Sequence, residues 1–503
     1  MHKRFEQQIT LDTLAIPDVE IPLKSRDELP PTLAGLKYIF ITPELNNKVF
    51  ELLEEKICKN KKKQGRPGMD LWHTLVLAVV RHATGTDWDS LHLWANEMGL
   101  IRKVMGVYKI KFSVSEEITF NCQTIKDNVS LIDDDLLQKI NQLVVEAGHK
   151  MLIKKKEDEG LRLKTDSFVV ETNVHFPTDL NLLWDSMRKC FDTVEELNEV
   201  TKMKGWRKIK SLRMKFKALF RSTSQMVFKG KNEKKKKEAV KNYLEVTLGY
   251  KERFDAIIKE PPVAIGCEKQ IDLIVISLIH YNQYVVKFYD QIERRLIKGE
   301  TIEAEEKVYS IFEAHTEWIT KGKQNKKVEL GLLTLITTDQ YQFIVDYKVM
   351  EKERDQAQMK PLLERINKNF PEVKIHSHSF DKGFYSKDNN DLINASDVEK
   401  PILPKKGRHT IADKEREHEP EFITLRHKHS AVESNINMLE HHGLNRCMDK
   451  GKKNFKRYVG LSVLAYNLHI LGNAILKNER KEQERKEAQR LMQLEKRQMK
   501  MAA

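Results

Sequence analysis

The segment LRLKTDSFVV, residues 161–170, alternates apolar with polar side chains and then becomes rich in β-branched residues. A period of two residues is typical of a β-strand, because successive side chains of a strand point to opposite faces. The charged stretch 154–160 precedes this segment, and Pro177 follows it. The sequence therefore predicts a strand that carries the carboxylate of Asp166.

The chain after this strand predicts an α/β protein. Residues 178–314 have a helical pattern, broken by Glu-Pro-Pro at 260–262. The later pattern predicts a β-hairpin at 328–337 and 341–347, a helix at 354–370, strands at 373–380 and 401–404, and helices at 426–442 and 455–477. In this order Asp166 and Asp381 fall at strands, and Glu433 falls on a later helix.

The chain before the strand predicts mainly helices. The Pro-punctuated residues 16–33 are expected to be extended, and helices are expected at 43–59, 69–82, 87–98, 119–131 and 134–150. The pair at 69–82 and 87–98, joined by Gly85-Thr86, resembles a helix-turn-helix. A helical hairpin used for packing or dimerisation explains the same pattern equally well.

Positive charge is concentrated in one part of the chain. The whole sequence has 88 Lys and Arg against 74 Asp and Glu, which gives a net charge of +14. Residues 201–241 contain 16 Lys or Arg and 2 acidic residues, and so account for +14 by themselves. A basic segment of this kind favours an anionic partner, nucleic acid before membrane.

The basic segment supplies candidate contacts to the DNA backbone, since neutralising phosphates releases counterions. Trp206, Phe216 and Phe220 are interleaved with the cations, which strengthens this interpretation; a solvated, partly disordered face is the alternative. The candidate cations are Lys202, Lys204, Arg207, Lys208, Lys210, Arg213, Lys215, Lys217 and Arg221.

The remaining composition predicts a cytoplasmic protein. The five cysteines are scattered, which argues against a zinc ribbon and against a disulfide framework. Residues 1–8 are charged and do not resemble a signal peptide. The apolar stretch 459–476 is interrupted by polar residues such as Asn467 and His469, so we expect a buried helix there.

Three converging carboxylates would suit phosphodiester transfer in DNA. That reaction needs an activated water or 3′-hydroxyl and a stabilised leaving oxyanion, which two Mg²⁺ ions roughly 4 Å apart can provide. Such ions prefer oxygen ligands. Strand alternation alone, however, does not select three residues from the 74 acidic residues of this chain.

Several strings of this sequence resemble the bacterial insertion-sequence transposases of the DDE class, most closely the ISNCY type. Three strings resemble the catalytic blocks: TDSFVVETNVHFPTD (165–179) with LLWD (182–185), FDKGFYS (380–386), and HSAVESNINMLEHHGLNRC (429–447). Six more match in the family's order: IFEAHTEWI (311–319), GK (322–323), VELG (328–331), ILPKKGR (402–408), FKRYV (455–459) and AYNL (465–468). The resemblance covers roughly residues 65–472.

This resemblance implies an RNase H-like mixed sheet flanked by helices, interrupted by a helical insertion. It implies that Asp166, Asp381 and Glu433 are the catalytic metal ligands and hold two Mg²⁺ ions, for which Mn²⁺ can substitute. It further implies cleavage and strand transfer at terminal inverted repeats by a homodimer on paired ends of double-stranded DNA, in the nucleoid-containing cytoplasm and without a membrane partner.

The third block departs from the pattern of many relatives, which have Tyr and Arg before the Glu and Lys seven residues after it. Here the corresponding residues are Arg426, His429 and Glu440. Glu440 is an alternative third ligand, and we favour Glu433. The phosphate contact of the missing Lys could come from other cations, and Lys323 and Lys382 could also reach phosphates. The candidates to replace it are Lys405, Lys406, Arg408 and Arg446.

The expected domains follow from these features. They are an N-terminal extension (1–64), a helix-turn-helix-like DNA-end-binding or dimerisation domain (65–155), an RNase H-like catalytic domain (156–177 and 315–477), a basic helical insertion (178–314) and a charged helical tail (478–503). His175 and His315 could contact DNA or a metal-bound water, or could be ordinary polar residues near turns. Three rival functions stay open: a non-catalytic DNA-binding derivative, a nuclease of the same fold, and a basic RNA-binding or scaffold protein.

Overall fold

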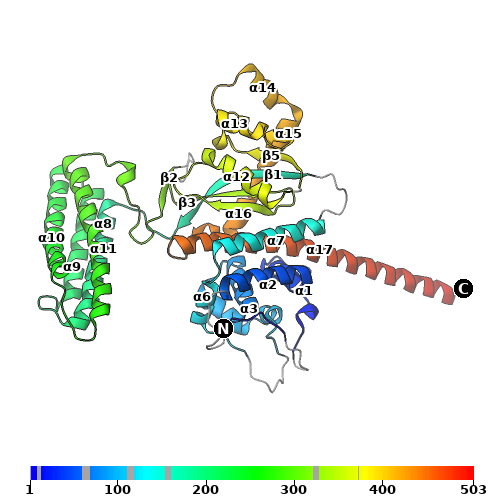
Figure 1. Cartoon of the computed structure of the whole chain (residues 1–503), viewed down its shortest axis with the longest axis horizontal. Helices are drawn as coiled ribbons and strands as arrows, with labels where there is room; N and C mark the ends of the chain where they lie inside the picture. Colours follow the sequence, from blue (N-terminus) through cyan, green and yellow to red (C-terminus); the bar gives the residue numbers. More distant parts are fainter. Residues whose placement is uncertain are drawn as a thin grey trace. The chain divides into compact units, whose positions relative to one another are not determined.

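The computed structural model describes residues 2–7, 13–58, 68–109, 118–152, 160–320, 328–371 and 373–502. The chain forms two compact units. One unit comprises Met1–Asn173 and Gly331–Ala503, and the other comprises Val174–Leu330. Figure 1 shows the helices and strands of each unit.

A mixed β-sheet carries the first part of the candidate site. Its order is β2-β3-β1-β5-β6, with β4 paired to β3 and β7 paired to β1. The central strand β1 runs antiparallel to β3 and parallel to β5 and β7. The strands are β1 (Leu161–Thr172), β2 (Glu317–Thr320), β3 (Val328–Thr338), β4 (Ile344–Val349), β5 (Ile375–Phe380), β6 (Lys400–Ile402) and β7 (Arg446–Cys447).

Buried polar side chains fix the register of the three central strands. The hydroxyl oxygen of Thr165 on β1 lies 2.7 Å from the hydroxyl oxygen of Thr337 on β3 and 2.8 Å from Nε2 of His378 on β5. All three residues are buried. A slip by one residue would turn each of them to the opposite face of the sheet, so these hydrogen bonds specify one register.

Helices cover both faces of this sheet. On one face, Phe168 and Val170 of β1 share a hydrophobic cluster with Val432 and Leu439 of α16. On the other face, Leu161 and Leu163 belong to the large cluster that includes α7, α12 and the N-terminal helices. The helices on the C-terminal side of the chain are α12 (Asp355–Asn369), α13 (Lys387–Asn394), α14 (Ile411–His418), α15 (Pro420–His429), α16 (Ala431–Leu439) and α17 (Lys452–Ala502).

The N-terminal helices join the same hydrophobic cluster. They are α1 (Leu29–Ile41), α2 (Pro43–Cys58), α3 (Leu71–Ala83), α4 (Trp88–Glu97), α5 (Gly99–Met105), α6 (Cys122–Val129) and α7 (Asp134–Leu152). The expectation of an extended segment over 16–33 is wrong from Leu29 onward. Pro30 and Pro31 stand in the first turn of α1, where backbone N–H groups need no helical partner, so these prolines begin the helix instead of preventing it. Every residue of α3 is buried, which favours packing as the role of this half of the helical pair.

The helix α17 begins as a core helix and continues as a solvated one. Among the described helices, Lys452–Glu495 within α17 passes the length and apolarity criteria for a membrane span, but 78% of its apolar window is buried inside the protein. After Leu476 its described side chains are mostly exposed and charged.

The unit Val174–Leu330 contains four long helices that run side by side in Figure 1. They are α8 (Asp179–Thr201), α9 (Ile209–Lys229), α10 (Glu233–Lys259) and α11 (Glu268–Ile292). Their shared core contains Phe191, Phe216, Tyr243 and Phe254.

The motif residue Asn467 on α17 completes the edge of the hairpin strand β4. Its side-chain amide accepts a hydrogen bond from the backbone N–H of Ile344 (2.9 Å) and donates one to the carbonyl oxygen of Ile344 (2.8 Å). It also donates to Oδ1 of Asn141 on α7 (2.8 Å). The amide thus takes the place of a neighbouring strand and joins α7, α17 and the sheet.

We predict that Asn467→Leu lowers the free energy of unfolding by about 2–4 kcal/mol, because the buried N–H of Ile344 and Oδ1 of Asn141 lose their partner, while the carbonyl oxygen of Ile344 keeps only Asn141. Urea unfolding followed by circular dichroism measures the change. The matched control is Asn473→Leu at an exposed position of the same helix, which should change stability by less than about 0.5 kcal/mol. Equal effects of the two substitutions would contradict this role for Asn467.

Candidate active site

The parallel pairing of β1 with β5 brings the first two predicted carboxylates to adjacent positions. Thr165 pairs with Phe380 in this register, so the next residues along the two strands are Asp166 and Asp381. Neighbouring strands lie about 4.8 Å apart. Two aspartates that are 215 positions apart in the sequence therefore meet at one level of the sheet.

Backbone N–H groups orient both aspartates. Oδ1 of Asp166 accepts a hydrogen bond from the backbone N–H of Ser167 (2.7 Å). Oδ2 of Asp381 accepts one from the backbone N–H of Gly383 (3.3 Å), where Asp381 caps the short helix Lys382–Phe384. A Cβ at position 383 would lie 3.1 Å from a carboxylate oxygen of Asp355.

The third predicted carboxylate, Glu433, lies in the first turn of α16. Val432 and Leu439 anchor this helix on the sheet, and the side chain of Glu433 is exposed. His429 is the last residue of the preceding helix, α15, and contacts strand β5. Its Nδ1 is 2.9 Å from the hydroxyl oxygen of Ser379 on β5.

The pKa of His429 depends on the charged groups around it. Burial lowers the pKa of His429, the carboxylates of Asp381 and Glu433 raise it, and the ammonium of Lys164 lowers it. Asp381 on the sheet and Glu433 on the helix therefore both lie within electrostatic reach of a single imidazole.

The direction of α16 favours Glu433 over Glu440. Ser430 and Ala431, at the start of the helix, line a cavity together with Lys164 of β1. Beyond the π-helical turn Glu440–Leu444, strand β7 pairs with Glu171 and Thr172 at the far end of β1. The helix thus follows β1, so Glu433 lies near the level of Asp166, and Glu440 lies about 10 Å further along.

The carboxylates suit a magnesium ion in their chemistry but are not gathered into one cluster. Among the residues that the structure describes, no three His, Cys, Asp or Glu side chains lie close enough together to hold a metal ion. Asp166 and Asp381 supply oriented oxygen ligands of the kind that hard cations prefer. The pair fits such an ion, and the third carboxylate stands on the neighbouring helix.

A basic cavity that was not predicted from the sequence lies on the same face of the sheet. It has a volume of about 400 Å³, and among the described residues it is lined by three cations, Arg162, Lys164 and Lys428, and by no acidic side chain. Four hydroxyls also line it, those of Ser377, Ser379, Ser430 and Ser434. Burial and the charge of Lys428 lower the pKa of Lys164, although Asp339 acts against them.

A sequence signal for this cavity was present. Arg162, Lys164 and Asp166 are separated by two residues each, and that spacing places all three on one face of a strand. The structure covers them with α15 and α16 and leaves a positively charged space that suits a phosphate.

Three of the predicted phosphate-binding cations are held in ion pairs within the protein. Lys405 pairs with Asp413, Arg446 pairs with Glu171 (3.2 Å) and Arg213 pairs with Asp192 and Glu195. Lys210 lies 3.5 Å from Glu195 but is largely exposed. Lys382, Lys406 and Arg408 are exposed, and Lys323 lies outside the described residues.

The basic segment displays most of its cations, while Trp206, Phe216 and Phe220 pack against other helices of the unit. Trp206 and Phe216 belong to the core of the four-helix unit, and Phe220 stacks on Trp184 with ring centroids 5.7 Å apart. The interleaved pattern is therefore that of an amphipathic helix and does not indicate a stacking surface for bases. The cations that are exposed are Lys202, Lys204, Arg207, Lys208, Lys210, Lys215, Lys217 and Arg221.

The two histidines considered as ligands have acidic neighbours within their own unit. His175 Nε2 lies 3.2 Å from Asp185 Oδ2, and His315 Nδ1 lies 3.7 Å from Glu313 Oε2.

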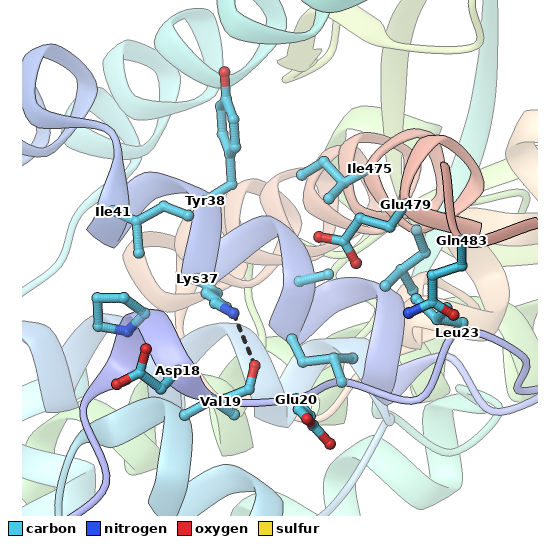
Figure 2. Close-up of a pocket in the computed structure, with 14 residues that line it drawn as sticks. Asp18, Val19, Glu20, Leu23, Lys37, Tyr38, Ile41, Ile475, Glu479 and Gln483 are labelled. Atoms are coloured by element: carbon cyan, nitrogen blue, oxygen red, sulfur yellow. Dashed lines mark hydrogen bonds between the residues drawn. The ribbon is translucent and has the colours of Figure 1, made fainter. Parts of the chain in front are cut away.

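A cavity of about 480 Å³ lies apart from these residues, between the N-terminal segment and α17. Figure 2 shows Lys37 donating a hydrogen bond to the carbonyl oxygen of Val19 (2.7 Å) beside it. None of the three predicted carboxylates lines this cavity, so it is not part of the candidate active site.

We predict that Asp381→Asn lowers the pKa of His429, because the substitution removes a negative charge that stabilises the imidazolium. Lys164→Met should raise the same pKa, since it removes a neighbouring positive charge. Titration of the imidazole signals by NMR measures both changes. The control is Glu440→Gln, which should leave the pKa of His429 unchanged; a shift with this variant and none with Asp381→Asn would overturn the arrangement described above.

Comparison with known proteins agrees with this geometry. Residues 292–468 match the family model described as "Transposase DDE domain". The matched region includes Asp381 and Glu433, and Asp166 precedes it. No curated protein and no solved structure matches the chain. The mixed sheet with its covering helices is consistent with an RNase H-like domain, and residues 292–468 of this chain are similar to the transposase DDE domain family.

Proposed function

We propose that this chain is a DNA transposase that cleaves and rejoins DNA at the ends of an insertion sequence. Asp166, Asp381 and Glu433 are its proposed catalytic residues. The observation that supports this most is the parallel register of β1 and β5, which sets Asp166 beside Asp381 in a chain whose residues 292–468 match the transposase DDE domain model.

The proposed chemistry depends on a divalent metal, magnesium or manganese. When bound, such an ion would stabilise the charge that develops on the phosphodiester and would increase the reactivity of water or of a 3′-hydroxyl. Asp166 and Asp381 would hold it from the sheet, and Glu433 would complete the site from α16.

The other residues of the site position the DNA. Arg162, Lys164 and Lys428 would neutralise a backbone phosphate in the basic cavity, a role that the missing Lys at position 440 does not fill. His429 is held by Ser379 between Asp381 and Glu433. Since burial keeps its pKa low, His429 is neutral at pH 7 and leaves the negative charge of the carboxylates available to cations.

The proposed partner is double-stranded DNA. The exposed cations of α9 and of the segment before it would contact the backbone and supply affinity with little sequence choice. We further propose that the helices of residues 65–155 contribute to recognition of the terminal repeats, and that the protein acts as a homodimer on paired ends in the nucleoid-containing cytoplasm. We also propose that the chain is of the ISNCY type.

We predict that Asp166→Asn, Asp381→Asn and Glu433→Gln each reduce cleavage of DNA carrying the element's ends by roughly 100-fold or more, because even supporting residues around a metal typically contribute ~10–100-fold. The assay follows nicking of labelled DNA in Mg²⁺ or Mn²⁺. The matched control is Glu440→Gln, which should retain most of the activity.

Two outcomes would replace the proposed function by a different one. A wild-type protein that binds the ends tightly and cuts in neither metal would be a non-catalytic DNA-binding derivative. A protein that cuts but never joins a pre-cleaved 3′ end to target DNA would be a nuclease of the same fold. Equal losses for Glu433→Gln and Glu440→Gln would leave the third ligand wrongly assigned.

We also predict that replacing Lys208, Lys215 and Lys217 by Met reduces the slope of log K against log salt concentration by about 2–3 for DNA binding, because each phosphate contact contributes about 0.9. Fluorescence anisotropy at several salt concentrations measures the slope. Lys360→Met with Lys368→Met is the control, at exposed positions of α12. An unchanged slope in the triple variant would show that α9 does not face DNA.

A further inference from the structure

One face of α11 is exposed, apolar and free of charge. The 14 residues from Leu273 to Val286 contain no Asp, Glu, Lys or Arg, although 32% of the whole chain is charged. Leu273, Ile276, Ile279 and Val286 are 67%, 61%, 38% and 49% exposed. Scattered exposed apolar residues are ordinary, but several apolar side chains aligned on one uncharged helix face, here with His280 and Gln283 among them, indicate an interaction surface.

The opposite face of α11 already has its partners. Ile271, Ile274, Leu278 and Phe288 are buried in the core of the four-helix unit. The exposed residues are therefore not a misplaced core face. They form a second stripe, which we call the outer stripe, at the helical spacing of three and four residues: Lys269, Asp272, Leu273, Ile276, Ile279, His280, Gln283, Val286, Lys287 and Asp290.

The charges at the two ends of the outer stripe are arranged to complement a second copy. Reading along the helix, Lys269 and Asp272 precede the apolar centre, and Lys287 and Asp290 follow it. When two such helices lie antiparallel, with a two-fold axis between Ile279 and His280, each Asp272 stands at the level of the partner's Lys287. Each Lys269 likewise stands at the level of the partner's Asp290.

The apolar residues agree with the same alignment. Leu273 stands at the level of the partner's Val286, and Ile279 at the level of the partner's His280. Parallel pairing in register would instead place Lys269 beside the partner's Lys269 and Asp272 beside the partner's Asp272. Like charges at the same level oppose association, so the pattern selects the antiparallel arrangement.

We propose that the outer stripe of α11 binds the outer stripe of a second copy of this chain, antiparallel and about a two-fold axis. Such an interface is isologous, the commonest form of homodimer contact. DNA is a poor occupant of the stripe, because its central residues offer no cation to a phosphate. The inference goes beyond the catalytic proposal and would hold for a chain that binds DNA without cutting it.

The strength of the contact follows from its size. A helix of 25 residues is about 37 Å long, and a single pair of such helices lies near the lower end of specific interfaces, about 1,200 Å². We therefore expect a dissociation constant on the order of 1 μM for the full chain without DNA.

Charge reversal tests the pairing directly. Asp272→Lys places two cations at each end of the paired stripes, and Lys287→Asp places two anions there, so each variant alone should weaken self-association by about tenfold or more. Sedimentation velocity of the full chain over a concentration series measures this. The control is Glu252→Lys, which has the same charge change at an exposed position of α10 and should leave self-association unchanged.

Mixing the two reversed variants is the decisive measurement. The Asp272→Lys chain and the Lys287→Asp chain complement each other across the proposed two-fold axis, so an equimolar mixture should recover the wild-type association. A contact of the stripe within one chain cannot respond to mixing. A monomeric wild type at about 50 μM, well above the expected dissociation constant, or a mixture no stronger than its components, would overturn the proposal.

Cross-linking gives an independent readout of the axis. His280→Cys places a thiol beside the two-fold axis and should form a disulfide-linked dimer under mild oxidation. Gln270→Cys, which is exposed on α11 but off the outer stripe, should not do so beyond the level given by the five natural cysteines. Equal cross-linking of these two variants would count against the antiparallel arrangement. Loss of cleavage would not, since none of the changed residues belongs to the proposed active site.

Discussion

The candidate site depends on a buried hydroxyl that joins three strands. Thr165 contacts Thr337 on one side and His378 on the other, and Asp166 is the next residue. Because burial lowers the pKa of His378 to about 3, this imidazole stays neutral and bonds to the hydroxyl without introducing a charge into the core. Any other register would leave these polar groups buried without partners, at a cost of about 1–3 kcal/mol each. The buried hydrogen bonds of Thr165 therefore hold Asp166 and Asp381 at neighbouring positions.

The same alternation explains why opposite charges are neighbours on the other side. Odd positions of this part of β1 face the core, and Arg162, Lys164 and Asp166 share the opposite face. The cations lie where α15 and α16 cover the strand, and the carboxylate lies where β5 ends. Three alternating residues of one strand, Arg162, Lys164 and Asp166, thus place two cations in the basic cavity and one carboxylate beside the end of β5. The arrangement needs no loop of its own.

Much of this fold was predictable because apolar periodicity is strong where an element is half-buried. The strand with Asp166, the hairpin of β3 and β4, helix α12 and the strand before Asp381 were all predicted close to their observed bounds. The selection of the three carboxylates came from resemblance, since nothing in strand alternation distinguishes Asp166 from many other acids. The family match supports the region of Asp381 and Glu433, while the individual site residues stay proposals.

Two short elements near the candidate site carry little apolar periodicity and were hard to predict from the sequence. Helix α14 has no buried residue, and α15 buries only Phe422, so neither leaves a hydrophobic stripe to recognise. The predicted helix over 426–442 is in fact interrupted at Ser430, and its last turn is π-helical. These short polar elements depend on capping and on ion pairs such as that of Lys405 with Asp413, which are contacts made only after folding.

The point where the four-helix unit is inserted has a consequence for how this chain could have been assembled. Glu171 near the end of β1 is paired with Gly331 in β3, so the residues that flank the unit Val174–Leu330 lie on adjacent strands. A side chain at position 331 would collide with the carbonyl oxygen of Val170, which keeps the two strands in close contact there. The insert is thus attached through a closed neck, and the entropy of closing a loop grows only slowly with its length. Whole modules could be gained, lost or exchanged at this neck in evolution, or grafted there in the laboratory, while the paired aspartates keep their register.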